Sequence, residues 1–133
     1  MKILITGNMG YVGPRLVEQL RFSRPEAVLV GLDIGYFAHC LTGVNTFPEN
    51  RLNIQYYGDV RKLSQDLFED VDVVVHLAAI SNDPMGDRFK DVTHDINYKA
   101  SIGLATEAKA AGVGRFVFAS SCSVYGFAEG GAR

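Results

Sequence analysis

The first thirteen residues place an apolar strand directly before a glycine-rich turn. Residues 3–13 read Ile-Leu-Ile-Thr-Gly-Asn-Met-Gly-Tyr-Val-Gly, with glycines at positions 7, 10 and 13. Apolar side chains then recur at helical spacing, at Val12, Leu16, Val17 and Leu20. Pro14 stands in the first turn of this helix, where its missing N–H costs little. We therefore expect a strand over about 2–6, a tight turn, and a helix over about 11–22.

Such a turn can hold a diphosphate, because a helix N-terminus presents unpaired N–H groups and a partial positive charge. Three glycines alone would also fit an ordinary strand-to-helix turn. Their place between the first strand and the first helix favours a dinucleotide-binding loop. Such a loop requires an acidic residue about 20 positions later, at the end of the second strand. Asp33 follows the apolar run at 27–32, at the expected spacing from Gly13. Its carboxylate would repel a 2′-phosphate, so we expect NAD rather than NADP.

Composition limits the class of protein. The chain has 133 residues, 47% of them hydrophobic, and a formal net charge of −2. We expect one α/β domain, cytoplasmic, with no affinity for nucleic acid or membrane. No apolar run approaches the roughly 18 residues that span a bilayer. Cys40 and Cys122 are expected to be free thiols, and the three histidines lack metal-ligand spacing.

Strand and helix patterns alternate along the rest of the chain. We expect strands at 27–32, 53–57, 71–77 and 115–120, a short helix near 61–69 and a long one over 88–111. Between 34 and 50 we expect irregular structure with at most a short helix near 36–41. The pattern predicts a Rossmann-type, doubly wound parallel sheet in the order 3-2-1-4-5. Ligands bind such a sheet at the carboxyl ends of its strands, where Thr6, Asp33, Asp59, Ala78 and Ser120 fall.

Five short motifs stand in order along the chain. Residues 6–13 match T-G-x-x-G-x-x-G, residues 58–61 match G-D-[IV]-R, and residues 76–79 match H-x-A-[AG]. Residues 97–101 match N-x-x-[GA]-[TS], and residues 120–126 match S-S-x-x-V-Y-G. Together they resemble the extended short-chain dehydrogenases/reductases, in their NAD-dependent nucleotide-sugar epimerase/dehydratase branch. The matches cover nearly the whole chain.

The resemblance implies a set of site residues around the glycines and Asp33. The expected cofactor-binding residues are Gly7, Gly10, Tyr11, Val12, Gly13, Asp33, Asp59, Val60, Leu77, Ala78, Ala79, Asn97 and Ser120. Ser121 occupies the position of the catalytic Ser/Thr, which hydrogen-bonds the reacting oxygen. Ser81 and Asp83 lie on the substrate side in the family, and for Asp83 the alternative of a turn formed by Asn-Asp-Pro stays open. His76, at the end of a buried strand, is expected in the core or beside the cofactor.

One element of the family pattern is missing. The family's acid/base pair is Tyr-x-x-x-Lys, and no tyrosine in the 133 residues has a lysine four positions later. We therefore expect this chain to carry the cofactor-binding half of an epimerase/dehydratase, truncated after strand five and inactive alone. Strand five would be an exposed apolar edge, which predicts a homo-oligomer or a self-associating fragment. Two alternatives stay open: a non-catalytic dinucleotide-binding module, and an NAD(P)-dependent reductase of small carbonyl compounds.

Overall fold

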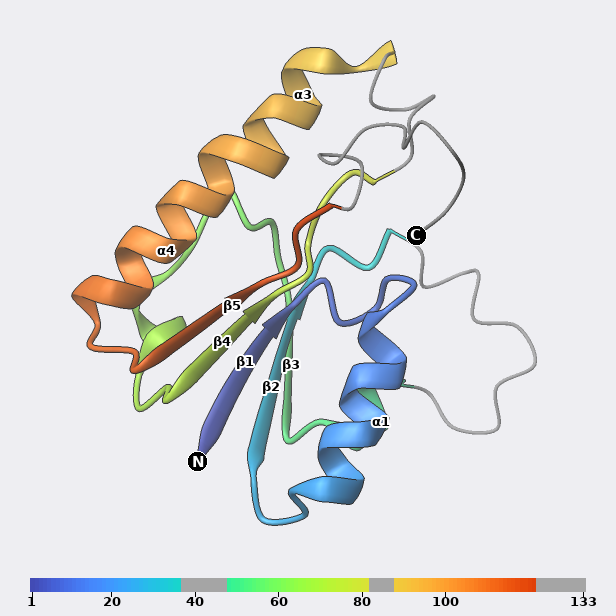
Figure 1. Ribbon diagram of the computed structural model, residues 1–133, viewed down its shortest axis with the longest axis vertical. Coiled ribbons are helices and arrows are strands. Elements are labelled where there is room, and N and C mark those ends of the chain that lie inside the picture. Colours follow the sequence, from blue (N-terminus) through green and yellow to red (C-terminus); the bar gives the residue numbers. More distant parts are fainter. Residues whose placement is uncertain (37–47, 82–87, 122–133) are drawn as a thin grey trace, which may run out of the picture.

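A single parallel sheet of five strands forms the centre of the protein. The computed structural model describes residues 1–36, 48–81 and 88–121, and Figure 1 shows their arrangement. The strand order is β3-β2-β1-β4-β5, with every neighbouring pair parallel, which confirms the predicted sheet. The strands are β1 (Lys2–Thr6), β2 (Val28–Asp33), β3 (Ile54–Tyr57), β4 (Val73–His76) and β5 (Arg115–Phe118).

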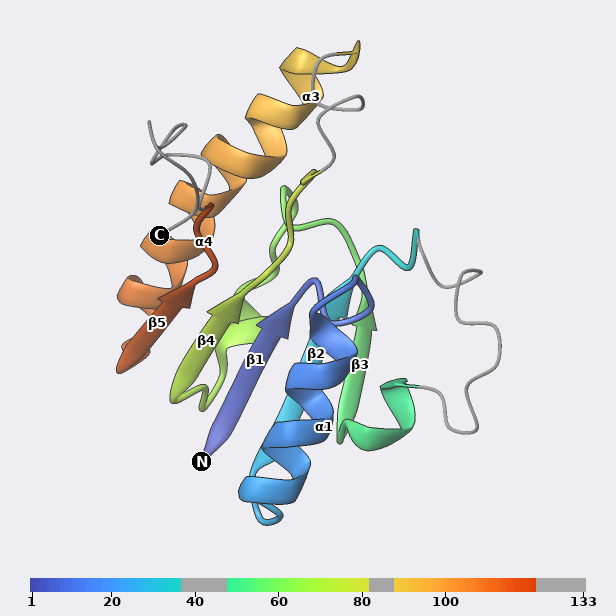
Figure 2. The same cartoon turned by 45° about the vertical axis from the view of Figure 1, so that its right-hand side comes forward.

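Helices lie on both faces of this sheet (Figures 1 and 2). One face is covered by α1 (Gly13–Ser23), and the other by the continuous helical segment α3 (Lys90–His94), η4 (Asp95–Ala100) and α4 (Ser101–Ala110). Two short 3₁₀ helices, η2 (Pro48–Arg51) and η3 (Gln65–Phe68), precede β3 and β4. No helix of the described segments is long and apolar enough to cross a membrane.

The apolar core divides into two clusters, one on each face of the sheet. Ile3, Ile5 and Leu29 pack with Val17 of α1. The alternate residues Leu4, Val30 and Val74 pack with Leu104 and Ala108 of α4. This alternation follows from the two-residue period of a strand, and covering both faces makes β1 and β2 apolar almost throughout.

The expected helix over 88–111 differs from the structure in one respect. Residues Asp95–Ala100 form a π-turn, so the segment is two α-helices joined by a wider turn. The sequence predicts one apolar stripe along this segment, made of Val92, Ile96, Ala100, Leu104, Ala108 and Ala111. Ala100, Leu104 and Ala108 are buried and Ile96 is partly buried, whereas Val92 is 41% exposed and Ala111, after the end of α4, is exposed. The π-turn contains one residue more than an α-helical turn. The side chains that precede it are therefore rotated about the helix axis, away from the buried stripe of α4.

A short 3₁₀ helix, η2, stands at 48–51, where the sequence predicted irregular structure, and the short helix expected near 61–69 is the 3₁₀ helix η3 over 65–68. The other elements differ from the expectation by a few residues at their ends. The possible helix near 36–41 lies outside the described residues.

The β5 strand pairs with β4 and presents much of its apolar surface to solvent. Phe116, Val117 and Phe118 are 37%, 51% and 53% exposed. An apolar strand at a sheet edge is a template for pairing with another chain. The self-association expected from the sequence stays a prediction.

A glycine in the middle of β2 makes room for a buried amide. Asn8 is fully buried, and its Nδ2 donates to Oε1 of Gln55 at 2.7 Å. A Cβ at Gly31 would lie 2.7 Å from three atoms of the Asn8 amide. Among the described residues, Oδ1 of Asn8 has no hydrogen-bond partner. The loop after β1 therefore packs directly against β2, and this contact fixes the distance between the loop and the sheet.

We predict that Gly31→Ala destabilises the fold by about 1–3 kcal/mol, because the new methyl group overpacks the Asn8 amide. Gly103→Ala is the matched control, since a Cβ at Gly103 in α4 meets nothing within 4 Å. That control should leave stability unchanged or raise it by up to about 1 kcal/mol through helix propensity. Urea unfolding followed by circular dichroism measures both. Equal stability of the two variants would contradict the packing argument.

Candidate cofactor-binding site

The glycines of the first loop are required for different reasons. Gly7 has a φ of +74°, and a Cβ there would lie 2.6 Å from the backbone nitrogen of Ala78. A Cβ at Gly13 would lie 2.3 Å from the carbonyl oxygen of Asn8. A Cβ at Gly10 would meet only the carbonyl oxygen of Gly7, at 3.3 Å. The first and third glycines therefore close the loop onto its neighbours, while the second keeps the turn free of a side chain.

The N-terminus of α1 begins at this loop and lacks a capping side chain. Val12 occupies the N-cap position and makes no side-chain hydrogen bond, and the first turn contains no acidic residue. Tyr11 and Val12 are 100% and 58% exposed. A helix start without a cap leaves N–H groups for an external acceptor, and the helix dipole favours an anion there. The loop therefore fits the diphosphate of a dinucleotide.

Asp33 ends β2 beside the glycine loop, as the spacing predicts. Its Oδ2 accepts a hydrogen bond from the Met9 backbone N–H at 2.9 Å, and its Oδ1 accepts one from Gly35 at 2.8 Å. Each carboxylate oxygen has two lone pairs, so each can still accept a ligand hydroxyl. The side chain is therefore oriented before any ligand arrives.

Asp59 follows β3 and is paired with a residue to which the sequence assigned no role. The guanidinium of Arg61 donates to both carboxylate oxygens of Asp59, and the Arg61 backbone N–H donates to Oδ1 at 2.9 Å. These hydrogen bonds with Arg61 hold the pKa of Asp59 below its ordinary value, against the opposing effect of partial burial. Val60, beside it, is buried in the α4-side core cluster.

The segment after β4 lies against both the glycine loop and the π-turn. Leu77 and Ala78 are partly buried, and Ala79 is exposed. Asn97, inside the π-turn, makes two hydrogen bonds with the backbone of Ile80: its Nδ2 donates to the carbonyl, and its Oδ1 accepts the N–H, each at 2.8 Å. In the structure the Asn97 amide holds the loop after β4 in place, and its expected contact with the cofactor stays a prediction.

A buried histidine joins these parts. His76 is 1% exposed, and its Nδ1 lies 2.6 Å from Oγ1 of Thr6 and its Nε2 2.8 Å from Oγ of Ser101. The Ser101 hydroxyl donates to the carbonyl of Asn97 at 2.9 Å. With the hydroxyl proton on that carbonyl, the tautomer that satisfies all of these groups carries its proton on Nε2, donates to Ser101 and accepts at Nδ1 from Thr6. Burial lowers the pKa of His76, which favours this neutral form.

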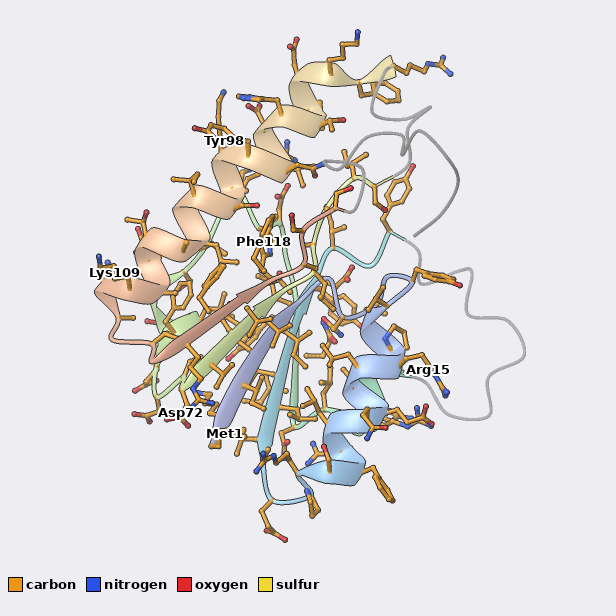
Figure 3. All side chains as sticks on the ribbon, in the orientation of Figure 1. Met1, Arg15, Asp72, Tyr98, Lys109 and Phe118 are labelled. Carbon is orange, nitrogen blue, oxygen red and sulfur yellow. The ribbon has the colours of Figure 1, made fainter. Side chains whose placement is uncertain are left out.

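The serines after β5 come to the same end of the sheet. The Ala119 backbone N–H donates to the His76 carbonyl at 3.1 Å, so the pairing of β4 and β5 continues to the residue before Ser120. Ser120, Ser121 and Ser81 are exposed. Figure 3 shows Phe118 at this end of the sheet, with Met1 and Asp72 at the opposite end. Asp83 lies outside the described residues. Within the described segments, no three His, Cys, Asp or Glu side chains gather as a metal site.

The strand ends therefore bring together Gly7, Asp33, Asp59, Ala78 and Ser120, as the topology predicts. The sequence argument missed the contacts that Thr6, His76, Ser101 and Arg61 make. All four residues lie inside the quoted motifs, which indicated that these segments belong to the site. The spacing within the motifs did not show which side chains would contact one another.

Comparison with known proteins agrees with this geometry. The model of the NAD dependent epimerase/dehydratase family matches residues 3–132. The chain belongs to this family. It is 34% identical over 137 aligned positions to the uncharacterized UDP-glucose epimerase YtcB of Bacillus subtilis, covering 98% of this chain and 43% of that protein.

Two solved structures are also similar to this chain. MoeE5, in complex with UDP-glucose and NAD, is 30% identical with a TM-score of 0.79; the match covers 98% of this chain and 40% of MoeE5. TunA, an NAD dependent NDP-hexosamine 5,6-dehydratase, is 27% identical with a TM-score of 0.79, with coverage of 96% and 39%. The chain thus spans about two fifths of the length of these relatives.

The lowered pKa of His76 predicts a pH dependence of stability. The unfolded chain takes up a proton near the ordinary pKa of about 6.5, while the folded chain resists it, so the free energy of unfolding falls as pH drops below that value. His76→Gln removes the titrating group and should flatten the curve between about pH 6.5 and 5. Asp59, whose pKa is lowered, loses its contribution only as pH falls through the ordinary carboxyl range near 3.8. Denaturant titrations across pH 4–8 measure this. An unchanged slope in the variant would contradict the assignment.

Proposed function

We propose that this chain is the NAD-binding part of an NAD-dependent oxidoreductase of the nucleotide-sugar epimerase/dehydratase type. The observation that carries the proposal is the Asp33 carboxylate, bound to Met9 of the glycine loop beside the uncapped start of α1. This arrangement supports a ribose acceptor and a diphosphate site next to each other at the switch point of the sheet. Membership of an NAD dependent family supports the choice of cofactor.

In this proposal, each part of the site has one task. The loop from Gly7 to Gly13, with Tyr11 and Val12 at its exposed corner, binds the diphosphate, and Asp33 accepts the hydroxyls of the adenosine ribose. Asp59 and Val60 bind the adenine ring, with the carboxylate accepting from its amino group. Leu77, Ala78 and Ala79 form a wall of the cofactor site, and Asn97 holds the loop that carries them.

The reacting end of the site lies beyond β5. Bound NAD would accept a hydride from a sugar carbon and later return that hydride to the sugar. Ser121 would hydrogen-bond the sugar oxygen, Ser120 would face the cofactor, and Ser81 and Asp83 would contact the substrate. We infer that the Tyr-x-x-x-Lys pair belongs to a later part of the polypeptide, as do the residues that select the sugar nucleotide. The UDP-glucose bound to MoeE5 supports a nucleotide sugar as substrate.

Removal of the Asp33 carboxylate tests the cofactor assignment. Asp33→Ala should weaken NAD binding roughly 10- to 100-fold, because hydrogen bonds from the ribose to a charged acceptor are lost. NADP binding should change far less, since the same substitution removes a repulsion from the 2′-phosphate. Isothermal titration calorimetry with both dinucleotides measures this.

Glu26→Ala is the matched control, because it removes an exposed carboxylate from the opposite end of β2. It should leave both affinities unchanged. An equal loss of NAD and NADP affinity in Asp33→Ala would refute the ribose assignment.

The reaction class is tested with the protein encoded by the complete reading frame. We expect turnover of at least one UDP-, GDP- or dTDP-sugar in the presence of NAD, and none of simple ketones. Product formation is followed by chromatography of the sugar nucleotides. Turnover of ketones alone would favour the small-carbonyl reductase, and NAD binding without any turnover would favour the non-catalytic module.

A further inference from the structure

We propose that His76 is a positioning residue that couples the glycine loop to the loop after β4, and so fixes the distance between two walls of the cofactor site. The inference rests on the proposed function. It begins with the sheet register, in which His76 is paired with Thr6 of β1 on one side and Phe118 of β5 on the other. His76 therefore stands between the strand that leads into the glycine loop and the strand that leads to Ser120.

The first connection runs through Thr6. Its hydroxyl is hydrogen-bonded to Nδ1 of His76 at 2.6 Å, and its carbonyl accepts the Leu77 N–H at 3.0 Å. The next residue, Gly7, approaches the Ala78 backbone so closely that a Cβ would not fit. A shift of Thr6 would therefore move the glycine loop relative to residues 77 and 78.

The second connection runs through Ser101 and forms a closed ring. Nε2 of His76 is hydrogen-bonded to Ser101 at 2.8 Å, and Ser101 donates to the carbonyl of Asn97. The Asn97 amide then holds Ile80, four residues after His76 in the chain. The ring returns along the backbone from Ile80 to His76. The segment 77–80 is thus fixed at both ends, by His76 and by the π-turn.

The position of the two partners distinguishes this role from that of a satisfied core histidine. Thr6, buried at the end of β1, leads directly into the glycine loop, and Ser101, at the start of α4, is bonded to Asn97, which holds Ile80. The rings of Phe116 and Phe118 lie at centroid distances of 6.2 Å and 5.7 Å from the imidazole, and they shield it on the β5 side. Thr6 and Ser101 contact different ring nitrogens of His76, so the imidazole bridges them.

The test is a double-mutant cycle across the imidazole, read as affinity for NAD. Thr6→Val and Ser101→Ala each remove one hydroxyl, and Thr6→Ser and Ser101→Thr are the controls that keep it. We expect each removal to weaken NAD binding about 5- to 10-fold, and the double variant to be weaker than wild type by clearly less than the product of the two factors. The controls should bind within about twofold of wild type.

Replacing the imidazole should abolish this coupling. In a His76→Phe background, or in His76→Gln if the first variant does not fold, Thr6→Val should have no further effect on NAD affinity. Free adenosine, which in the proposal meets Asp33 and Asp59 and neither of the coupled loops, should bind all variants within about twofold. Calorimetry gives the NAD affinities, and ligand-observed NMR gives those for adenosine.

The outcomes separate this inference from the function on which it rests. Multiplicative effects of Thr6→Val and Ser101→Ala, or an equal loss of adenosine affinity, would show a merely structural role and overturn the inference. A folded wild-type chain that fails to bind NAD would overturn the proposed function, and the inference with it.

Discussion

The close contact between the glycine loop and the loop after β4 is the constraint on which the site depends. At Gly7, two backbone segments meet with no room for a side chain between them. This contact brings the ends of β1 and β4 together, and the switch point of the sheet lies between them. Asp33 and Asn8 then attach the same loop to β2 and β3. The site is therefore assembled by short-range packing around one loop, with its polar side chains oriented in advance.

The polar side chains between β1, β4 and α4 form one connected network of hydrogen bonds. Thr6, His76, Ser101 and Asn97 are buried or partly buried, and each has a hydrogen-bond partner in the structure. Connected buried networks are worth more than isolated pairs, because breaking one member leaves others unpaired in a low-dielectric environment. The exception among the described residues is Oδ1 of Asn8, together with Oγ1 of Thr93. Asn8 thus packs closely on Gly31, at the cost of one unpaired amide oxygen.

The sequence predicted the sheet well because buried parallel strands are continuous apolar runs, as at Ile3–Ile5 and Val73–Val75. Asp33 was predictable because the distance along one helix and one strand fixes where the acid falls. The π-turn was not, since one extra residue leaves the apolar periodicity of α4 intact and displaces Val92, which lies before it. The contact between Thr6 and His76 was not predictable either, because it joins residues 70 positions apart and depends on sheet register.

The half-exposed rings of Phe116 and Phe118 have a consequence for the imidazole behind them. They form part of its apolar shell, yet 37% and 53% of their own surfaces face solvent. Any surface that packs over β5 would thicken this shell and exclude water from its outer side. The proton affinity of His76 would then fall further, since burial is what disfavours its charged form. A contact at the outer edge of the sheet would thus lower the effective dielectric constant around the buried imidazole.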